Sequence, residues 1–506
     1  MKPVQDVLIV GGGTAGWLAA CFLRRTLGDS IGITLVESKE IGIIGVGEGT
    51  FPSIRGTLSV IGIDEARFIR ECNATFKQGV HFANWVRPAG TPGQQSYFHP
   101  FSQPSQRPGG PELLPYWLLG AAGSTPFAEA ATLQKAVADA RHAPKRPGDA
   151  DYMGPLNYAY HFDAGSFAAL LCTHAQSLGV KRIEATVDSV ELAEDGAIAS
   201  VTTRESGKLT AGLYIDCTGF RARLIGEALG SPFRNINDTL FVDRAMAMQV
   251  PYDSPDAPIA SYTISTAHEA GWTWDIGLHE RRGVGYVFSS RHTDETRAEQ
   301  VLRNYIGKAS EGRDPRLLKL NVGYRDTQWV KNCVAIGLSG GFLEPLESSG
   351  IGLIEAATYL VSYLFPFNGD VAPVAKQFNE QMKARYEKIV DFVKLHYCLT
   401  KRTDNSFWTD NVNPSTIPET LREKLAMWRC RPPHQLDFIT DLEMYPPSSW
   451  QYVLYGMEFR TEIHNPRAYA QMGAAQKEFR MIAEVSKRAV ADLPTNRALV
   501  QHYTRK

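Results

Sequence analysis

Cysteine is scarce in this sequence, and neither sign of charge is in excess. Seven cysteines stand among 506 residues, and no two of them form a Cys-x-x-Cys pair. Thiols so few and so scattered predict a cytoplasmic protein without disulfides. Lysine and arginine number 53 against 54 aspartates and glutamates, a net charge of −1. The chain therefore lacks the basic surface that a nucleic-acid partner requires.

Metal-binding motifs and membrane spans are lacking as well. None of the twelve histidines falls at HxxxH or HxxEH spacing, so we expect no metal site. The uncharged run from Val7 to Leu23 contains three consecutive glycines and is short for a membrane span. No small-residue cleavage site follows it, so we interpret it as a strand, a turn and a helix rather than a signal peptide. We expect no membrane partner.

What is present is the composition of an ordinary globular protein. Hydrophobic residues make up 43% of the chain and charged residues 21%, which excludes disorder, a coiled coil and collagen. At 506 residues the chain has room for roughly two to four domains.

A glycine-rich turn between two short β-branched runs is the clearest motif. The runs are Val4 to Val10 and Ile33 to Val36, and the apolar stretch from Trp17 to Arg25 between them has helical character. The order predicts a βαβ unit. The turn has the spacing G-x-G-x-x-G, and an acidic residue follows about twenty residues later, as in dinucleotide-binding proteins.

Each residue of this fingerprint has a physical role. The first glycine permits a tight turn, the second lets the backbone approach a pyrophosphate, and the third permits close helix–strand packing. The acid can accept hydrogen bonds from ribose hydroxyls. The alternative interpretation is a structural glycine-rich turn. The residues predicted to bind the dinucleotide are Gly11, Gly13, Thr14, Ala15, Gly16 and Glu37.

The order of the later segments favours FAD over NAD. The chain continues with a glycine-rich loop before a helix, Ile41 to Ser53, instead of strictly alternating βα units. Two apolar runs, Ala211 to Phe220 and Cys333 to Ser339, end in glycine-rich turns and are typical of buried parallel strands. A nucleotide domain assembled from three separate pieces of chain is typical of flavoprotein hydroxylases.

We predict an α/β fold, α+β overall, with a Rossmann-like FAD-binding domain of the flavoprotein hydroxylase type, an antiparallel-sheet substrate lobe and a helical C-terminal region. Prolines between residues 88 and 118 lead us to expect no regular element there, but a long loop over a site. The expected boundaries are an FAD-binding module at 1–90, 150–235 and 325–368, a Pro/Gly-rich excursion at 91–149, the antiparallel-sheet lobe at 236–324 and a substrate-capping region at 369–506.

Four segments, in this order, resemble the flavin-dependent tryptophan/indole halogenases. They are GGGTAGW (Gly11 to Trp17), FKQGVHFANW (Phe76 to Trp85), GWTWDIG (Gly271 to Gly277) and GFLEPLESSGIGL (Gly341 to Leu353). The resemblance runs from residue 4 to about residue 365 and more loosely to the C-terminus. GWTWDIG departs from the family signature WxWxIP at its last position, where glycine replaces proline.

The residues alone leave other interpretations of these motifs open. Alternation from Phe76 to Trp85 predicts a strand with Lys77, Gly79, His81 and Ala83 on one face, where a solvated edge residue is the simplest interpretation of Lys77. Glu347 could be an acid stabilised by the dipole of a helix N-terminus. Paired aromatics such as Trp272 and Trp274 are more often core than function.

The resemblance gives these residues functional roles instead. It implies that Lys77 points into a tunnel between flavin and substrate and carries the activated halogen, as a haloamine or by hydrogen-bonding hypohalous acid. It implies that Glu347 faces this lysine and polarises the electrophile or accepts the arene proton. The backbone amides of Ser349 and Gly350 would hold the halide in an anion nest. Residues that would line the flavin are Val187, Leu338 and Ile351.

The activity implied is that of a two-component, FADH2-dependent halogenase, an oxidoreductase that chlorinates or brominates an indole-type aromatic through hypohalous acid. FAD as FADH2, chloride or bromide, and O2 are the expected cofactors, and a separate flavin reductase is the expected partner. A flavin-dependent aromatic hydroxylase (monooxygenase) of the same fold and a non-catalytic flavin-binding protein are the alternatives. The native substrate, the regiochemistry, the preferred halide and the oligomeric state stay open, with a homodimer among the options.

The C-terminal region bears on the substrate. By resemblance, free tryptophan would be held by a tyrosine pair and a glutamate. The corresponding segment, Asp441 to Phe459, has no adjacent tyrosine pair, and neither Glu443 nor Glu458 lies at the expected place. An unpaired buried polar group costs about 1–3 kcal/mol. We therefore predict that indole or a neutral substituted indole is preferred over tryptophan.

Overall fold

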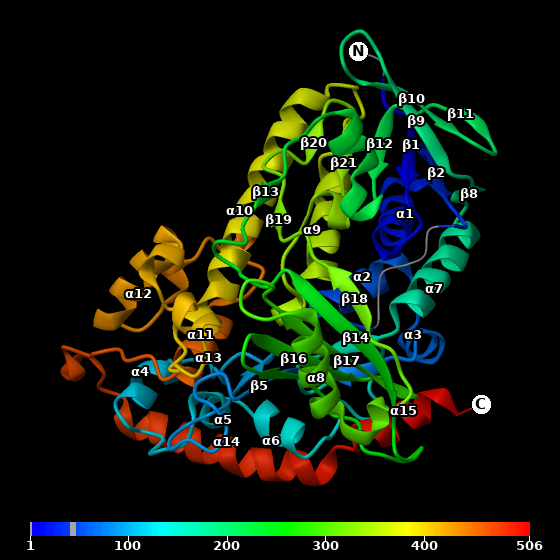
Figure 1. The fold of residues 1–506 in the computed structure, drawn as a ribbon. Helices are drawn as coiled ribbons and strands as arrows, with labels where there is room; N and C mark the ends of the chain where they lie inside the picture. Colours follow the sequence, from blue (N-terminus) through cyan, green and yellow to red (C-terminus); the bar gives the residue numbers. More distant parts are fainter. Residues whose placement is uncertain (1–2, 41–46, 506) are drawn as a thin grey trace. The chain divides into compact units, whose positions relative to one another are not determined.

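A computed structural model describes residues 3–40 and 47–505 (Figure 1). The glycine-rich loop predicted at Ile41 to Ser53 lies outside the described residues at 41–46. Contacts divide the chain into two compact units, each made of three segments. The first unit comprises Met1–Asn73, Phe162–Ile236 and Asn321–Glu387, and the second comprises Ala74–His161, Asn237–Leu320 and Lys388–Lys506.

The first unit is built on a six-stranded sheet in the order β20-β21-β12-β1-β2-β8. Five strands are parallel, and only the edge strand β20 runs antiparallel to its neighbour. The buried parallel strands predicted at Ala211 to Phe220 and Cys333 to Ser339 are confirmed. The strands are β1 (Asp6–Val10), β2 (Gly32–Glu37), β8 (Lys181–Glu184), β12 (Leu213–Asp216), β20 (Trp329–Val330) and β21 (Cys333–Ala335).

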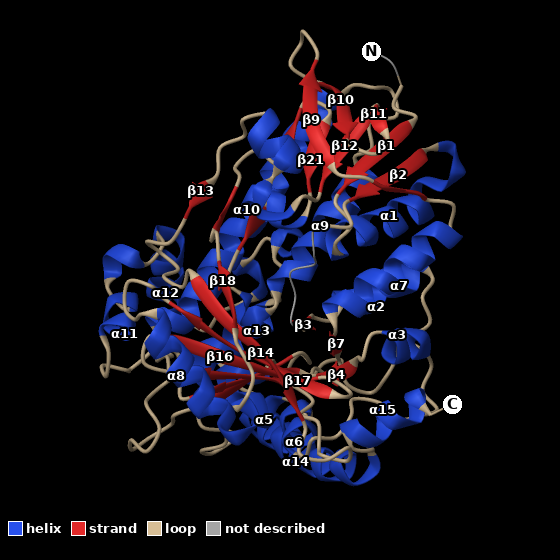
Figure 2. Cartoon of the chain, turned by 45° about the vertical axis from the view of Figure 1, so that its right-hand side comes forward, coloured by secondary structure: helices blue, strands red, loops and turns tan. Residues whose placement is uncertain are grey.

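The first unit also contains helices and two small antiparallel sheets. Helix α1 (Thr14–Leu27) packs against α7 (Ala164–Ser177) and α9 (Ser349–Tyr363), and the three lie on the same side of the parallel sheet (Figure 2). The strands β9 (Val187–Leu192), β10 (Ile198–Thr203) and β11 (Gly207–Leu209) form one small sheet, and β13 (Arg234–Asn235), β19 (Gly323–Tyr324) and β22 (Gly341–Phe342) form the other. Leu8 of β1 packs with Val201 of β10 in one hydrophobic cluster. The predicted βαβ unit is therefore the centre of a parallel α/β layer.

The second unit contains a seven-stranded sheet in the order β18-β14-β17-β16-β15-β5-β6. Its first five strands are antiparallel, as predicted for the antiparallel-sheet lobe. β5 joins them in parallel with β15, and β6 pairs antiparallel with β5. The strands are β5 (Gly79–Ala83), β6 (Tyr97–Pro100), β14 (Arg244–Pro251), β15 (Thr263–Ala267), β16 (Gly271–Gly277), β17 (Arg281–Phe288) and β18 (Arg316–Lys319).

Two local predictions were wrong. Residues 88 to 118 do contain regular elements, namely β6 and α4 (Leu113–Leu118). β6 lies at the sheet edge and Pro100 ends it, a position where a missing N–H is tolerated. The stretch from Phe76 to Trp85 is also not one strand. β4 (Thr75–Lys77) pairs with β7 (Ala159–Phe162) and ends before Gln78, and β5 begins one residue later at Gly79.

The helical character predicted beyond residue 370 is confirmed. Helix α10 (Val371–Cys398) contributes residues to both units. Within the described residues, no helix has the length and apolar character needed to cross a membrane. The later helices are α11 (Ser406–Asn411), α12 (Glu419–Cys430), α13 (Pro447–Gly456), α14 (Met472–Asp492) and α15 (Asn496–Thr504).

Candidate active site

The turn after β1 has a shape that only glycine permits. Gly11 has a φ of +115°, and a Cβ atom there would lie 2.2 Å from the Cys217 carbonyl oxygen. A Cβ at Gly16 would lie 1.9 Å from the Gly11 carbonyl oxygen, so this glycine brings α1 close to the strand. Around Gly13, in contrast, a Cβ would meet no atom within 4 Å. The turn is tight on one side and open at the start of the helix.

This open position suits a phosphate group. Thr14 and Ala15 are the first residues of α1, whose first N–H groups have no acceptor within the helix. The positive end of the helix dipole adds to their attraction for an anion. The pyrophosphate of a dinucleotide therefore fits the place that the sequence predicts.

Glu37, the last residue of β2, lies directly over the turn. A Cβ at Gly12 would come within 1.5 Å of its Oε2 atom. Oε2 accepts a hydrogen bond from Trp17 Nε1 at 3.3 Å, and Oε1 forms an ion pair with Arg182 Nε at 2.6 Å. The side chain is 16% exposed. The carboxylate thus lies beside the glycine-rich turn, where the sequence predicts an acid for the ribose hydroxyls.

The third piece of the predicted nucleotide domain also reaches this turn. The short helix η5 (Gly337–Ser339) carries Leu338, and a Cβ at Gly337 would lie 2.9 Å from Ala15 Cβ. Ile351 is buried in the first turn of α9, which packs against both η5 and α1. Val187 begins β9, next to Thr186, whose hydroxyl lies 2.8 Å from that of Ser38.

Glu347, Ser349 and Gly350 lie together at the N-terminus of α9. Glu347 is buried at 3% exposure and ends the short helix η6 (Pro345–Glu347). Ser348, with φ +57°, caps α9, so Ser349 and Gly350 present the first two N–H groups of the helix. Such groups form an anion-binding nest. Glu347 precedes the cap by one residue, so the dipole interpretation of this acid stays open beside the catalytic one.

Lys77 is the last residue of β4 in the second unit, and its side chain is 0% exposed. The interpretation as a solvated edge residue is therefore wrong. Its Nζ atom lies 5.3 Å from the centre of the Phe101 ring, a cation–π distance. Burial of an ammonium group costs free energy unless the surroundings stabilise it. A fully buried lysine is therefore unusual and is a candidate for a functional role.

A second fully buried lysine in the same unit shows what a structural one looks like. Lys394 Nζ donates hydrogen bonds to the Thr239 carbonyl oxygen at 3.0 Å and to Asn411 Oδ1 at 2.8 Å. It also lies 4.8 Å from the centre of the Phe241 ring. Lys394 ties three segments of this unit together and serves as a natural control for Lys77.

Sequence reasoning missed the aromatic neighbours of this lysine. His99 of β6 is buried, and its Nε2 atom lies 2.8 Å from the Ser449 hydroxyl, next to the fully buried Trp450. The His99 ring packs 6.5 Å from that of Phe101. The alternation in Tyr97-Phe-His-Pro-Phe101 was the available signal, and the surrounding prolines obscured it.

Of the paired tryptophans, Trp272 belongs to the core. It is fully buried, and its ring centre lies 6.3 Å from that of Trp85. Trp274 is half-buried and packs on Gly285, where a Cβ would come within 2.1 Å of the Trp274 ring. These contacts support the structural interpretation of this pair.

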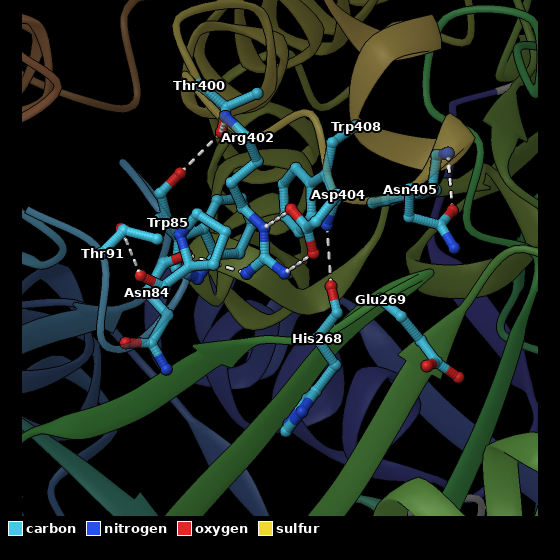
Figure 3. Close-up of polar contacts among 12 residues, drawn as sticks. Asn84, Trp85, Thr91, His268, Glu269, Thr400, Arg402, Asp404, Asn405 and Trp408 are labelled. Atoms are coloured by element: carbon cyan, nitrogen blue, oxygen red, sulfur yellow. Dashed lines mark hydrogen bonds and ion pairs between the residues drawn. The ribbon is translucent and has the colours of Figure 1, made fainter.

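A polar cluster fixes the end of β5 beside Trp85 (Figure 3). The Arg402 guanidinium forms an ion pair with Asp404 at 2.6 Å and donates to the Asn84 carbonyl oxygen at 2.9 Å. Trp408 Nε1 donates to the His268 carbonyl oxygen at 2.7 Å. Burial, aided by Arg402, lowers the pKa of His268 to about 4, so this histidine is neutral at physiological pH.

Both glutamates of the proposed substrate region already have cationic partners. Glu443 forms an ion pair with Lys388 at 2.5 Å and is 4% exposed. Glu458 forms ion pairs with Arg87 at 2.8 Å and with Lys401. The hydrogen bond from Arg87 is the main cause that lowers the pKa of Glu458 to about 2. Within the second unit, these carboxylates neutralise positively charged side chains of the protein itself.

Comparison with known proteins decides the family. The model of the family described as tryptophan halogenase matches residues 6–473. This chain belongs to the tryptophan halogenase family. Tryptophan 6-halogenase SttH of Streptomyces toxytricini is 35% identical and aligns over 97% of each chain. Tryptophan 7-halogenase RebH of Lentzea aerocolonigenes is 34% identical over 92% of this chain and 88% of its own.

Solved structures agree with this assignment. The tryptophan halogenase of Shewanella frigidimarina superposes with a TM-score of 0.95 at 41% identity, over 99% of this chain and 98% of its own. BrvH, a flavin-dependent halogenase of Brevundimonas, superposes with a TM-score of 0.89 at 35% identity, over 99% of both chains. The halogenase is therefore a flavin-dependent enzyme, and the predicted fold class is confirmed. The hydroxylase alternative is not favoured.

Proposed function

We propose that this halogenase is the halogenating component of a two-component system and acts on an indole-type aromatic with chloride or bromide. A separate flavin reductase supplies FADH2. The observation that carries the proposal is the fully buried Lys77 on the strand of the family motif. When bound, the reduced flavin supplies the electrons that reduce O2, and with the halide this yields hypohalous acid.

In this proposal the first unit binds the flavin and the halide. The glycine-rich turn holds the pyrophosphate, Glu37 holds the ribose, and the residues Val187, Leu338 and Ile351 line the flavin. The amides of Ser349 and Gly350 hold the halide at the N-terminus of α9. The close approaches at Gly11 and Gly16 and the open position at Gly13 support this assignment.

Lys77 transfers the halogen. As a neutral amine it takes the halogen from hypohalous acid, and its N–H proton leaves with the hydroxide as water. As an ammonium it instead donates a hydrogen bond to hypohalous acid and polarises it. In either case the arene attacks the halogen, and the leaving amine nitrogen or hydroxide keeps the bonding electrons and takes up a proton. The proton displaced from the ring carbon passes to Glu347. Phe101 and His99 are the proposed walls on the Lys77 side.

The relatives named above act on tryptophan, but this chain has features that favour a neutral indole. Glu443 and Glu458 are paired with Lys388, Arg87 and Lys401, so a substrate ammonium would have to displace these partners. Tyr445 is buried and stacks on Phe392 at 4.1 Å. Indole or a neutral substituted indole needs neither group, and we propose it as the better substrate.

The domain division keeps the boundaries predicted above, with an FAD-binding module in three pieces, an antiparallel-sheet substrate lobe and a helical capping region. We also propose a cytoplasmic location, because scattered unpaired thiols are typical of reducing compartments. A homodimer is the oligomeric form to test by light scattering.

Product analysis tests the function. Purified protein is incubated with a flavin reductase, NADH, chloride or bromide, and a panel of indoles, and the products are analysed by mass spectrometry. A halogenated product that requires the reductase supports the proposal. Rapid NADPH oxidation by the protein alone, stimulated by substrate and accompanied by hydroxylated product, would contradict it.

A further inference from the structure

His161 of β7 is a fully buried neighbour of Lys77. In the antiparallel ladder of β4 and β7, His161 lies opposite Thr75, and Ala159 lies opposite Lys77. Residues paired across a ladder point to the same side, so Lys77 and His161 are diagonal neighbours on one face. Diagonal neighbours lie about 7–8 Å apart, within reach of long side chains.

The imidazole of His161 is anchored at one nitrogen only. Its Nε2 atom lies 2.8 Å from the hydroxyl of Thr263, on β15. Its Nδ1 atom is buried and has no hydrogen-bond partner among the described residues. A buried nitrogen in this condition is uncommon and indicates a group or a water molecule that completes it. If Nε2–H donates to the hydroxyl, Nδ1 is an acceptor.

Within the described part of the second unit, Lys77 is the charged group whose electrostatic interaction changes the pKa of the His161 imidazole. Burial lowers the pKa of His161 well below its ordinary value, and the charge of Lys77 lowers it further. Thr75, Ala159 and Thr263 carry no charge. On the opposite face of the ladder, the ring of Phe76 packs with Tyr158, Tyr160 and Tyr503.

We propose that His161 is a positioning residue for Lys77, whose amine donates a hydrogen bond to Nδ1 of the neutral imidazole directly or through one water molecule. This inference rests on the proposed role of Lys77 in halogen transfer. The bond fixes the orientation of the lysine side chain. It also favours the protonated amine over the neutral one, because an acceptor stabilises the charged form of a lysine.

Two substitutions separate the nitrogens of the ring. His161→Asn keeps a polar atom near the place of Nδ1, whereas His161→Gln keeps one near Nε2 and loses Nδ1. Thr263→Val is the matched control that removes only the anchor of Nε2. A hydrogen bond to a charged group corresponds to about one to two units of pKa. We therefore expect His161→Gln to lower the pKa of Lys77 by about one unit or more, and His161→Asn and Thr263→Val to lower it less.

Two measurements report this change. Carbon-13 NMR of protein labelled at lysine Cε follows the titration of Lys77 without flavin, with Lys77→Met identifying its signal. The pH profile of halogenation at saturating FADH2 should show its lysine limb at lower pH in His161→Gln. A merely structural role would reduce halogenation by the same factor at every pH. Equal titration midpoints in the wild type and His161→Gln would overturn the inference.

The design keeps two failures apart. If Lys77→Met retains halogenation, the proposed role of the lysine fails whatever His161 does. If Lys77→Met abolishes halogenation while His161→Gln keeps the wild-type midpoint, only the inference about His161 fails. If His161→Gln does not fold, as judged by circular dichroism, His161→Phe keeps a ring without nitrogens and carries the same expectation.

Discussion

The two glycines at the start of α1 should respond in opposite ways to an added methyl group. At Gly16 the new Cβ would lie 1.9 Å from the Gly11 carbonyl oxygen, so backbone must move. Overpacking of this kind costs about 1–3 kcal/mol or more, against a gain of about 1 kcal/mol in helix propensity. Gly16→Ala should therefore lower the melting temperature of the flavin-free protein by several degrees.

At Gly13 the same change should spare the fold and weaken flavin binding. The backbone there is extended with φ −78°, and no atom lies within 4 Å of the added Cβ. The methyl group would occupy the space proposed for the pyrophosphate. Loss of one hydrogen bond to a charged group, about 1.5–3 kcal/mol, weakens FAD binding about 10- to 150-fold.

The assay pairs thermal unfolding without flavin with titration of FAD by quenching of tryptophan fluorescence. Gly13→Ala should melt like the wild type and bind FAD poorly. Wild-type affinity in Gly13→Ala would refute the placement of the pyrophosphate at this turn. An unchanged melting temperature in Gly16→Ala would show that the backbone at the start of α1 shifts to make room for the methyl group without loss of stability, and would contradict the overpacking argument.

Four further outcomes are expected. Lys77→Ala should abolish the halogenated product and leave oxidation of added FADH2 nearly unchanged. Lys394→Ala is the control and should destabilise the fold instead. A halogenated product retained in Lys77→Ala would remove Lys77 from the mechanism. Glu347→Gln should slow halogenation severely and leave FAD affinity intact, whereas lost affinity would indicate a structural role. Glu458→Gln should lower the melting temperature at neutral pH. The difference from the wild type should vanish as the pH falls from about 4.5 to about 2, because the pKa of Glu458 is lower in the folded protein than in the unfolded chain. A difference that stays constant with pH would contradict the ion-pair assignment. Indole should exceed tryptophan in kcat/KM, and the reverse order would refute the argument from Glu443 and Glu458.

The nucleotide turn could be predicted because its determinants are local. Strand, glycines, helix and acid follow one another between Asp6 and Glu37, and each glycine acts on atoms of its own βαβ unit or its neighbour. The burial of Lys77 could not be predicted in this way. Alternation places a residue on a face, but the contacts that cover this face, such as the Phe101 ring 5.3 Å from Lys77 Nζ, come from other segments of the chain.

The error at residues 88 to 118 has the same origin. Prolines and glycines there indicate a loop by every local criterion. Burial comes from α13, where Gly456 lies against Tyr97 of β6 so closely that a Cβ would come within 2.7 Å of the Tyr97 side chain. Tyr97–Pro100 becomes a strand by pairing with β5 and is covered by this contact with α13, and no pattern within the segment reports either interaction.

The departure from the family signature at Gly277 also has a structural explanation. A Cβ at this position would lie 2.8 Å from both Ile259 Cγ2 and the Tyr252 hydroxyl, so this chain has filled the space that a proline ring would need. The Tyr252 hydroxyl donates to the Leu278 carbonyl oxygen at 2.9 Å, which fixes the end of β16 in another way. The Gly277 carbonyl oxygen accepts a hydrogen bond from the Thr75 hydroxyl at 2.5 Å, two residues before the lysine of β4. With glycine at position 277, β4, the strand that carries Lys77, is held by the hydrogen bond from Thr75 to the Gly277 carbonyl oxygen. The difference from proline changes the packing around β16 and does not change the residues proposed for the chemistry.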